Sequence, residues 1–125
     1  MKKTFQIKGA PAPIGPYSQA VEKAGTLFIS GQIPLNPMTG ELVNSGITDE
    51  AHQVMKNLEA LLSEADYTWR DVMKCSIFLK DLNDFNTVNE VYASYFSSDF
   101  PARECVEVSK LPKDVNVEIS LIAIK

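Results

Sequence analysis

The part of the sequence best equipped for chemistry is a short segment in which an arginine precedes a cysteine. It reads Pro101-Ala102-Arg103-Glu104-Cys105-Val106-Glu107-Val108. Strand-like alternation places the two valines on one face and Arg103, Cys105 and Glu107 on the other. A guanidinium at the start of an apolar strand needs an anionic partner, and it grips a carboxylate through two parallel hydrogen bonds. The pattern fits a site for a small carboxylate and a salt bridge at the rim of a sheet about equally.

A carboxylate in the final apolar stretch is the second candidate. Glu118 lies between Val117 and Ile119, in a run of alternating apolar residues that ends at Ile124. From the pattern alone, Glu118 is best interpreted as an outward-facing residue on an edge strand. Its functional interpretation is a general base, or a group that positions a water molecule.

Nucleophilic catalysis receives little support from the sequence. Cys105 is a candidate nucleophile, but His52 is the single histidine available to activate it, so a packing role is the commoner one. Ser30 has no base beside it in the sequence, which makes a serine-hydrolase mechanism weakly supported. Cys75 lies on the apolar face of another predicted strand and is expected in the core.

Three further residues stand out by their position. Asn89 interrupts an apolar helical stripe, four residues after Phe85 and three before Tyr92, and needs hydrogen-bond partners if it is buried. Tyr17 follows a segment rich in proline and glycine, and is either a packing residue or a hydroxyl directed at a ligand. Gly31 lies within a predicted strand, where the absence of a side chain lets a ligand or another backbone approach closely.

Composition narrows the class of protein and its partners. A chain of 125 residues is the length of one domain, residues 1–125, with a buried core. The net charge is −4 and the basic residues are scattered, which argues against a nucleic-acid partner, although a patch assembled by folding stays open. No apolar run approaches the roughly 20 residues of a membrane span, so we expect no membrane association.

The same inventory indicates the compartment and the absence of a metal site. Residues 1–5 carry two lysines without the apolar core of a secretory signal. Two cysteines far apart in the sequence do not form a disulfide framework, and one histidine without a Cys-x-x-Cys pair fits few metal sites. We therefore expect a cytoplasmic protein that holds no metal.

Hydrophobic periodicity predicts two helices and several strands. Thr48 is expected to cap a first helix that reaches about Ala65, and Asp84 is expected to cap a second. Strands are predicted over residues 4–7, 17–22, 26–32, 71–80, 101–108 and 115–124, with a short strand over 41–43. This order predicts an α/β (α+β) fold with a single mixed β-sheet and two helices on one face.

The second face of that sheet has no helices to cover it. Strict alternation assigns Gln32 to this outer face and Met73 to the inner one. The outer face is further expected to carry a mixture of apolar and polar side chains, namely Phe28, Ile122, Ile124, Ser30, Arg103 and Glu118. A face of this kind usually packs against another copy of the chain, so we expect a closed ring or a dimer.

A set of motifs resembles a known family. In chain order the motifs are Gly15-Pro16-Tyr17-Ser18-Gln19, Ser30-Gly31-Gln32-Ile33-Pro34, Val88-Asn89, Pro101-Ala102-Arg103, Cys105-Val106-Glu107-Val108 and Leu111-Pro112-Lys113-Asp114. Together they span essentially the whole chain and resemble the reactive intermediate deaminase family, called the Rid or YjgF family. One departure is Asp66, at a predicted helix end where many relatives have glycine.

The resemblance implies an assembly and an activity. It implies a chorismate-mutase-like fold, a homotrimer with clefts between subunits, and a cytoplasmic enzyme of metabolite damage control. That enzyme would hydrolyse reactive 2-imino acids or their enamine tautomers, such as 2-iminobutanoate and 2-iminopropanoate, to 2-oxo acids and ammonia. No cofactor and no metal are implied.

The resemblance also assigns roles by position. Arg103 would bind the substrate carboxylate, and Glu118 would orient or activate the attacking water. The remaining residues would line the pocket, and they are Tyr17, Ser30, Gly31, Asn89 and Cys105.

Two other functions compete with this one. A non-catalytic trimer that senses small 2-oxo carboxylates would use the same arginine. Glu118→Gln separates the two, because it should stop a hydrolase and leave the binding of a sensor intact. RNA cleavage or translational inhibition is also associated with the family, and it fits the acidic balance of the chain poorly.

Overall fold

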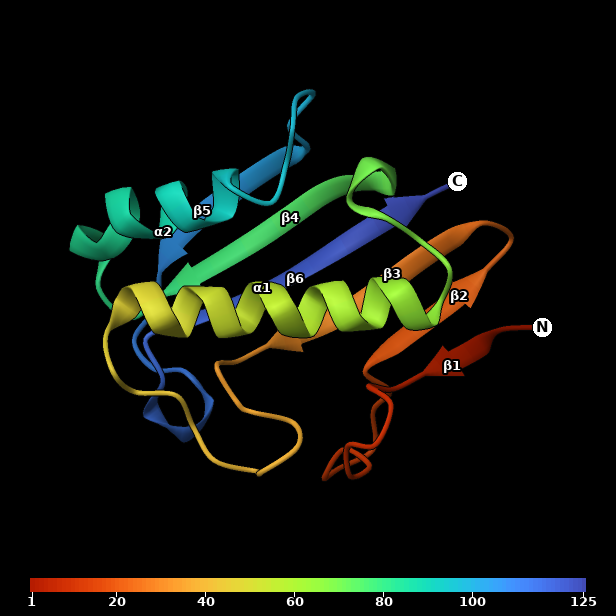
Figure 1. Cartoon of the computed structure of the whole chain (residues 1–125), viewed down its shortest axis with the longest axis horizontal. Helices are drawn as coiled ribbons and strands as arrows, with labels where there is room; N and C mark the ends of the chain where they lie inside the picture. The colour runs from red at the N-terminus through yellow and green to blue at the C-terminus, as the bar shows by residue number, and fades with distance from the viewer.

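The computed structural model describes all residues, 1–125, and contains one six-stranded sheet with two helices on one face (Figure 1). The strands are β1 (Lys3–Phe5), β2 (Ala20–Lys23), β3 (Thr26–Gln32), β4 (Val72–Leu79), β5 (Ala102–Glu107) and β6 (Val117–Ile124). Their order across the sheet is β1-β2-β3-β6-β4-β5. Neighbouring strands are antiparallel except β4 and β5, which are parallel. The predicted mixed α+β sheet is confirmed, and β5 lies at its edge.

The first helix begins differently from its prediction. Helix α1 (Ile47–Glu64) has Gly46 at its N-cap position with φ 126°, a backbone conformation that suits glycine, and no side chain caps it. The predicted cap, Thr48, instead lies inside the first turn. Asp49 and Glu50 in that turn place negative charge where the helix dipole favours it.

The second helix, α2 (Phe85–Ala93), is nine residues long and follows a short 3-10 turn. Asp84 occupies its N-cap position as predicted, but its side chain makes no capping hydrogen bond. Asp81 makes a capping hydrogen bond at the start of the preceding 3-10 turn, where its carboxylate accepts from the backbone N–H of Asn83 at 2.9 Å. Residues of α2 that are three and four apart, including Phe85, Asn89 and Tyr92, therefore lie along one face of the helix.

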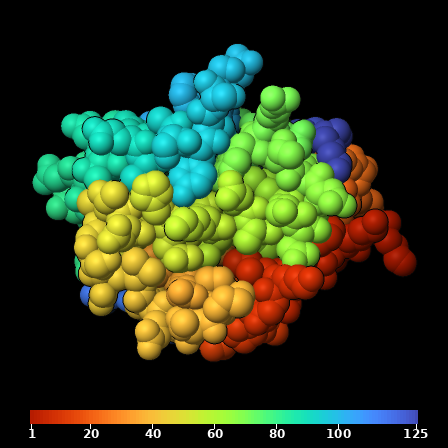
Figure 2. Space-filling model, in the orientation of Figure 1, coloured from red at the N-terminus to blue at the C-terminus, as the bar shows by residue number.

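The core lies between the two helices and the sheet. Helix α1 buries its apolar stripe against the strands, through Ala51, Val54, Met55, Leu58, Leu61 and Leu62. Alternate residues of β6 pack against that stripe from the sheet, and they are Val117, Ile119, Leu121 and Ala123. Each leucine buried in this way contributes roughly 2 kcal/mol. Figure 2 shows this helix-covered side in space-filling form, with α1 and α2 closed over the sheet.

Two register shifts move residues away from strict alternation. Between Ile29 and Gln32 the pairing with β6 shifts, so Gln32 is buried and not on the predicted outer face. A second shift between Val72 and Lys74 exposes Met73, which alternation had assigned to the inner face. Both predictions were wrong for the same reason, because one inserted residue reverses the faces.

Two segments are less regular than predicted. The strand expected over 41–43 is reduced to a single bridge between Leu35 and Leu42. Strand β2 begins at Ala20, so Tyr17 lies in the irregular segment before it and not in a strand. That segment is nevertheless tied to β3, because the Ser30 hydroxyl donates to the Ser18 carbonyl at 2.7 Å.

The sheet face opposite the helices is uncovered and carries exposed apolar side chains. Phe28 is 51% exposed, Val106 is 42% exposed and Ile124 is 47% exposed. Exposed apolar groups gathered on a sheet face are typical of a contact surface. Neither helix has the length and apolar character needed to cross a membrane.

Candidate active site

Arg103 lies on the helix-covered face of the sheet. Strand β5 pairs with β4 in a parallel register that sets Arg103 beside Cys75 and Cys105 beside Ile77. Cys75 and Ile77 are both buried beneath the helices, and paired residues share a face. The expectation that Arg103 shares the uncovered face with Phe28 was therefore wrong. The larger apolar residue of β5 on the uncovered face is Val106.

The guanidinium of Arg103 has neutral and aromatic neighbours. Its Nη1 donates to the Asn89 side-chain oxygen at 2.5 Å. Its Cζ lies 5.5 Å from the ring centroid of Phe85 and 5.1 Å from that of Tyr92. The two ion pairs of the chain are formed by other residues, so no carboxylate lies within 4.0 Å of this half-buried cation. The predicted need of Asn89 for a partner is met by Arg103.

A hollow opens beside this arginine. It has a volume of about 560 Å³ and is lined by Asn89, Tyr92, Ala93, Phe100, Pro101 and Arg103. Cys105 is half-buried two residues further along β5. Burial raises the pKa of the Cys105 thiol, and the charge of Arg103 opposes that rise only in part. Cys105 is not among the residues that line the hollow, and a thiol held neutral in this way is a poor nucleophile.

Glu118 and Gly31 form a second group. Glu118 alternates with the buried Val117 and Ile119 of β6, so its side chain lies on the uncovered face. There it packs over Gly31, where an added Cβ would lie 2.7 Å from Glu118 Cδ and still closer to Oε2. Burial raises the pKa of the Glu118 carboxyl, which strengthens its carboxylate as a base.

Two other predicted residues belong with this second group. Ser30 precedes Gly31 and donates its hydroxyl to Ser18, while its N–H donates to the Gln19 carbonyl at 2.9 Å. These bonds hold the segment that carries Tyr17 against β3. Tyr17 is 55% exposed, so its ring and hydroxyl are free to contact a partner.

The seven predicted site residues thus separate into two groups within one chain. The arginine group comprises Asn89, Arg103 and Cys105, and the glutamate group comprises Tyr17, Ser30, Gly31 and Glu118. The groups lie on opposite sheet faces, and β4 separates the strands of Arg103 and Glu118. Strands two apart are roughly 10 Å from one another. A small substrate bound to Arg103 therefore cannot reach Glu118 of the same chain.

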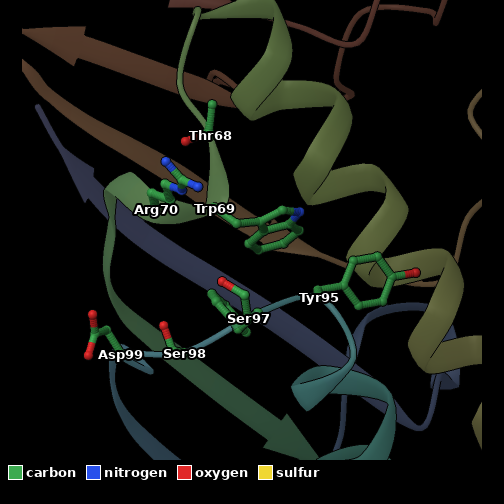
Figure 3. Close-up of a pocket in the computed structure, with 8 residues that line it drawn as sticks. Thr68, Trp69, Arg70, Tyr95, Ser97, Ser98 and Asp99 are labelled. Carbon is green, nitrogen blue, oxygen red and sulfur yellow. The ribbon is translucent and has the colours of Figure 1, made fainter.

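Another hollow lies between the turn after α1 and the segment after α2. It measures about 710 Å³ and is formed by Thr68, Trp69, Arg70, Tyr95, Phe96, Ser97, Ser98 and Asp99. Figure 3 shows these residues on the turn after α1 and on the segment after α2. The Trp69 indole N–H already donates to Glu59 at 2.8 Å, and the ring packs against Tyr95. None of the seven predicted residues lines this hollow, so we do not place the site there.

No set of three or more histidine, cysteine, aspartate or glutamate side chains is arranged to hold a metal ion. The arrangement supplies instead a cation for an anionic group, a basic carboxylate, and hydroxyl groups. These functional groups suit the binding of a carboxylate and the activation of water.

Comparison with known proteins decides the family. A family model described as Endoribonuclease L-PSP matches residues 7–125. The chain is a member of the YjgF/Rid family. The resemblance inferred from the motifs is thereby confirmed, and the match covers both groups of predicted residues.

Relatives of this Rid chain include proteins named for an activity and proteins named only for a family. It is 53% identical over 125 residues to the RutC family protein PH0854 of Pyrococcus horikoshii, covering 100% of this chain and 99% of that protein. It is 46% identical over 128 residues to the 2-iminobutanoate/2-iminopropanoate deaminase of Escherichia coli K12, covering 100% and 99%.

Solved structures of Rid proteins share the whole fold. The conserved Rid family protein YyfA from Yersinia pestis matches with a TM-score of 0.95 at 47% identity, covering 100% of both chains. The structure of E. coli TdcF with bound serine matches with a TM-score of 0.92 at 41% identity, covering 98% of both chains.

Sequence reasoning missed two residues of this Rid chain that contact the arginine. Phe85 and Tyr92 were assigned to the core stripe of α2, yet both rings lie against the Arg103 guanidinium. A signal was present, because Asn89 stands between them at helical spacing. A polar residue in an apolar stripe indicates that the stripe faces a charged or polar partner.

Proposed function

We propose that this protein hydrolyses 2-imino acids to 2-oxo acids and ammonia, at a site shared between two copies of the chain. The observation that carries the proposal is the state of Arg103. It is a half-buried cation that lies beside a hollow, with one amide hydrogen bond and no carboxylate within 4.0 Å. Holding a buried cation without a counter-ion is costly, and a ligand carboxylate would supply the missing negative charge.

The division of the site residues supports an assembly of copies. Arg103 is on the edge strand β5, so its outer side is open to a neighbouring molecule. Glu118, Gly31 and Ser30 lie on β6 and β3, which carry exposed apolar side chains suited to contact with another copy. A copy that presents this face to the neighbour's β5 would bring the two groups together. We take the number of copies, three, from the family resemblance.

The chemistry requires few groups. With the carboxylate of the substrate on Arg103, the protonated imine carbon is already electrophilic. Glu118 of the neighbouring copy accepts one proton from a water molecule as the water oxygen bonds to that carbon. The protonated Glu118 then returns this proton to the amino nitrogen of the resulting carbinolamine. The C–N bond then breaks and ammonia leaves, while the hydroxyl of the intermediate gives its proton to the Glu118 carboxylate to form the ketone. That proton passes on to ammonia, which departs as ammonium.

Two relatives support this substrate class. The E. coli relative at 46% identity is named as a 2-iminobutanoate/2-iminopropanoate deaminase. The TdcF structure holds serine, an amino acid with the same α-carboxylate. A 2-imino acid differs from an amino acid at the α-carbon and nitrogen, so one arginine is suited to both.

The test uses an imine that a second enzyme generates within the assay. A threonine dehydratase supplies 2-iminobutanoate from threonine, semicarbazide competes for it, and semicarbazone absorbance is followed with and without this protein. Wild type should suppress the semicarbazone signal, and Arg103→Ala should behave as buffer. The matched control is Arg70→Ala, which removes the one other arginine, an exposed residue, and should suppress the signal as wild type does. A wild-type curve equal to buffer would exclude the proposed activity.

Glu118→Gln separates catalysis from sensing. A hydrolase loses turnover with this variant and still binds 2-oxobutanoate, since Arg103 is intact. A sensor of 2-oxo acids shows no turnover in either protein and binds equally in both. The net charge of −4 gives no support to RNA cleavage.

A further inference from the structure

The arginine of the site is held by three side chains that lie in a line along α2. Phe85, Asn89 and Tyr92 are separated by four and three residues, so a ring, an amide and a second ring share one face of the helix. All three contact the same guanidinium. The ring centroids of Phe85 and Tyr92 lie 5.5 Å and 5.1 Å from Arg103 Cζ, and the Asn89 side-chain oxygen lies 2.5 Å from Nη1. We call Phe85, Asn89 and Tyr92 together the Arg103 cradle, in which Phe85 and Tyr92 are the two aromatic rings.

Aromatic rings hold a cation differently from carboxylates. The face of a ring carries partial negative charge and attracts a guanidinium, but it leaves the full positive charge in place. A carboxylate at the same position would neutralise the cation and occupy the N–H donors that a ligand needs. Asn89 accepts from Nη1 through its neutral side-chain oxygen, so the cradle leaves the other N–H donors of Arg103 available.

The Tyr92 hydroxyl does not explain why an aromatic residue occupies this position. Tyr92 is 4% exposed, and its buried hydroxyl has no hydrogen-bond partner in the structure. The Cys75 thiol lies close enough to affect it, and burial together with Cys75 raises the pKa of the Tyr92 phenol. The phenol therefore remains neutral and adds no negative charge beside Arg103. What Tyr92 offers the arginine is the face of its ring.

We propose that Phe85 and Tyr92 are positioning residues, whose rings fix the direction of the Arg103 guanidinium while leaving its charge and its outer donors free for a carboxylate. The inference rests on the proposed function for the identity of the substrate. The inference can be tested without turnover, because the affinity for any small 2-oxo acid measures how well Arg103 binds a carboxylate. An arginine already fixed in place loses less conformational freedom when a ligand binds, which improves affinity.

The variants are chosen to separate ring from hydroxyl and site from fold. Tyr92→Leu and Phe85→Leu each remove one ring, and Phe85 is half-buried, so that variant places less demand on the core. Tyr92→Phe keeps the ring and removes the unpaired hydroxyl. Tyr95→Leu is the matched control, because Tyr95 follows α2 and packs on Trp69 and His52, outside the cradle.

The first measurement is the Kd of 2-oxobutanoate by titration calorimetry. Each ring removal should weaken binding by about 2- to 30-fold, the range expected for one cation–π contact. Tyr92→Phe should recover the affinity that Tyr92→Leu loses. If either leucine variant binds as tightly as wild type while remaining folded, the proposal is wrong.

The second measurement observes the arginine itself. The chain contains two arginines, Arg70 and Arg103, so ¹⁵N-arginine labelling gives two Nε–Hε signals and Arg70 is an internal reference. In Tyr92→Leu and Phe85→Leu the Arg103 side chain should become more mobile, and its Nε–Hε chemical shift should move toward that of the exposed Arg70. Tyr95→Leu should leave the Arg103 signal unchanged. A residue that matters only for packing would lower stability without moving this signal, and that result would overturn the positioning role.

The two proposals fail in distinguishable ways. If wild type hydrolyses no imine but binds 2-oxobutanoate, and the leucine variants lose both affinity and the ordered Arg103 signal, the proposed function fails and the cradle stands. If wild type hydrolyses imines and the leucine variants keep both affinity and signal, the cradle fails and the proposed function stands.

Discussion

Gly31→Ala is a small change with a large expected effect, because Gly31 lies beneath the Glu118 carboxylate. An added Cβ would lie 2.7 Å from Glu118 Cδ and 3.0 Å from Cγ, whereas ordinary contact begins near 3.4 Å. The carboxyl carbon must therefore retreat by about 0.7 Å. The backbone itself can accept alanine, because Gly31 has no positive φ.

The displacement should affect rate more than stability. A catalytic group misplaced by about 1 Å can cost on the order of 100-fold in rate, so we expect kcat to fall by about 10- to 100-fold. This loss corresponds to roughly 1.4–2.7 kcal/mol of transition-state stabilisation. The displaced atoms belong to a flexible side chain, so Tm should change little. Steady-state kinetics on imine generated by the dehydratase, with thermal melts in parallel, measure both quantities.

A double-mutant cycle checks the cause. If Gly31→Ala acts by moving Glu118, the change should cost almost nothing further in a Glu118→Ala background. An undiminished kcat in Gly31→Ala would refute the assignment of Glu118 as the base. Equal rate losses in both backgrounds would show that Gly31 acts through something other than Glu118.

Four further predictions concern Arg103, Glu118 and Asn57. Arg103→Lys keeps the charge but loses the planar fork, so KM should rise by about 10-fold or more with a smaller change in kcat, as initial-rate kinetics would show. Burial raises the pKa of Glu118, so turnover should fall as pH drops through that raised pKa. The same burial disfavours the charged form in the folded state, so Glu118→Gln should raise Tm at pH 8, with the gain vanishing on acidification. Asn57 is buried and donates to the carbonyls of Ile33 and Leu35, so Asn57→Ala should lower the free energy of unfolding by about 2 kcal/mol in urea titrations.

Helix existence and most strands could be predicted from the sequence because they depend on local periodicity. The apolar stripe of α1 and the alternation of β6 are both confirmed by burial. The start of α1 was placed wrongly because Thr48 has the side chain of a cap, whereas Gly46 has the backbone conformation. Helix caps depend on φ and ψ, which residue type constrains only loosely.

The face of Gln32 at the end of β3 and the faces of β5 could not be predicted from local pattern. The inserted residue between Ile29 and Gln32 reverses the side chains that follow it, and alternation gives no notice of such a shift. The face of Arg103 depends on its register with Cys75, which is a long-range pairing between parallel strands. The apolar Val106 lies on the uncovered face of this edge strand, so its apolar character did not indicate which face of β5 meets the helices. Exposed apolar residues of this kind are common, since much protein surface is apolar.

The candidate site residues were chosen by motif, and the motifs do not indicate how these residues are arranged. Sequence motifs indicate which residues belong together without indicating which chain supplies each one. The separation of Arg103 and Glu118 onto opposite faces appears only once the sheet order and register are known. That separation turns a list of residues into the hypothesis of a shared site.

The most direct test of the shared site is complementation between two inactive variants. Arg103→Ala and Glu118→Gln are each expected to be inactive alone. When they are co-expressed in equal amounts and assemble at random, a cleft is intact only if its arginine and its glutamate both come from unaltered positions. That combination occurs in about one quarter of the clefts of a closed ring, so imine hydrolysis should return to roughly 25% of wild type. Activity no higher than that of the separate variants, in assemblies shown by mass to contain both, would contradict the account.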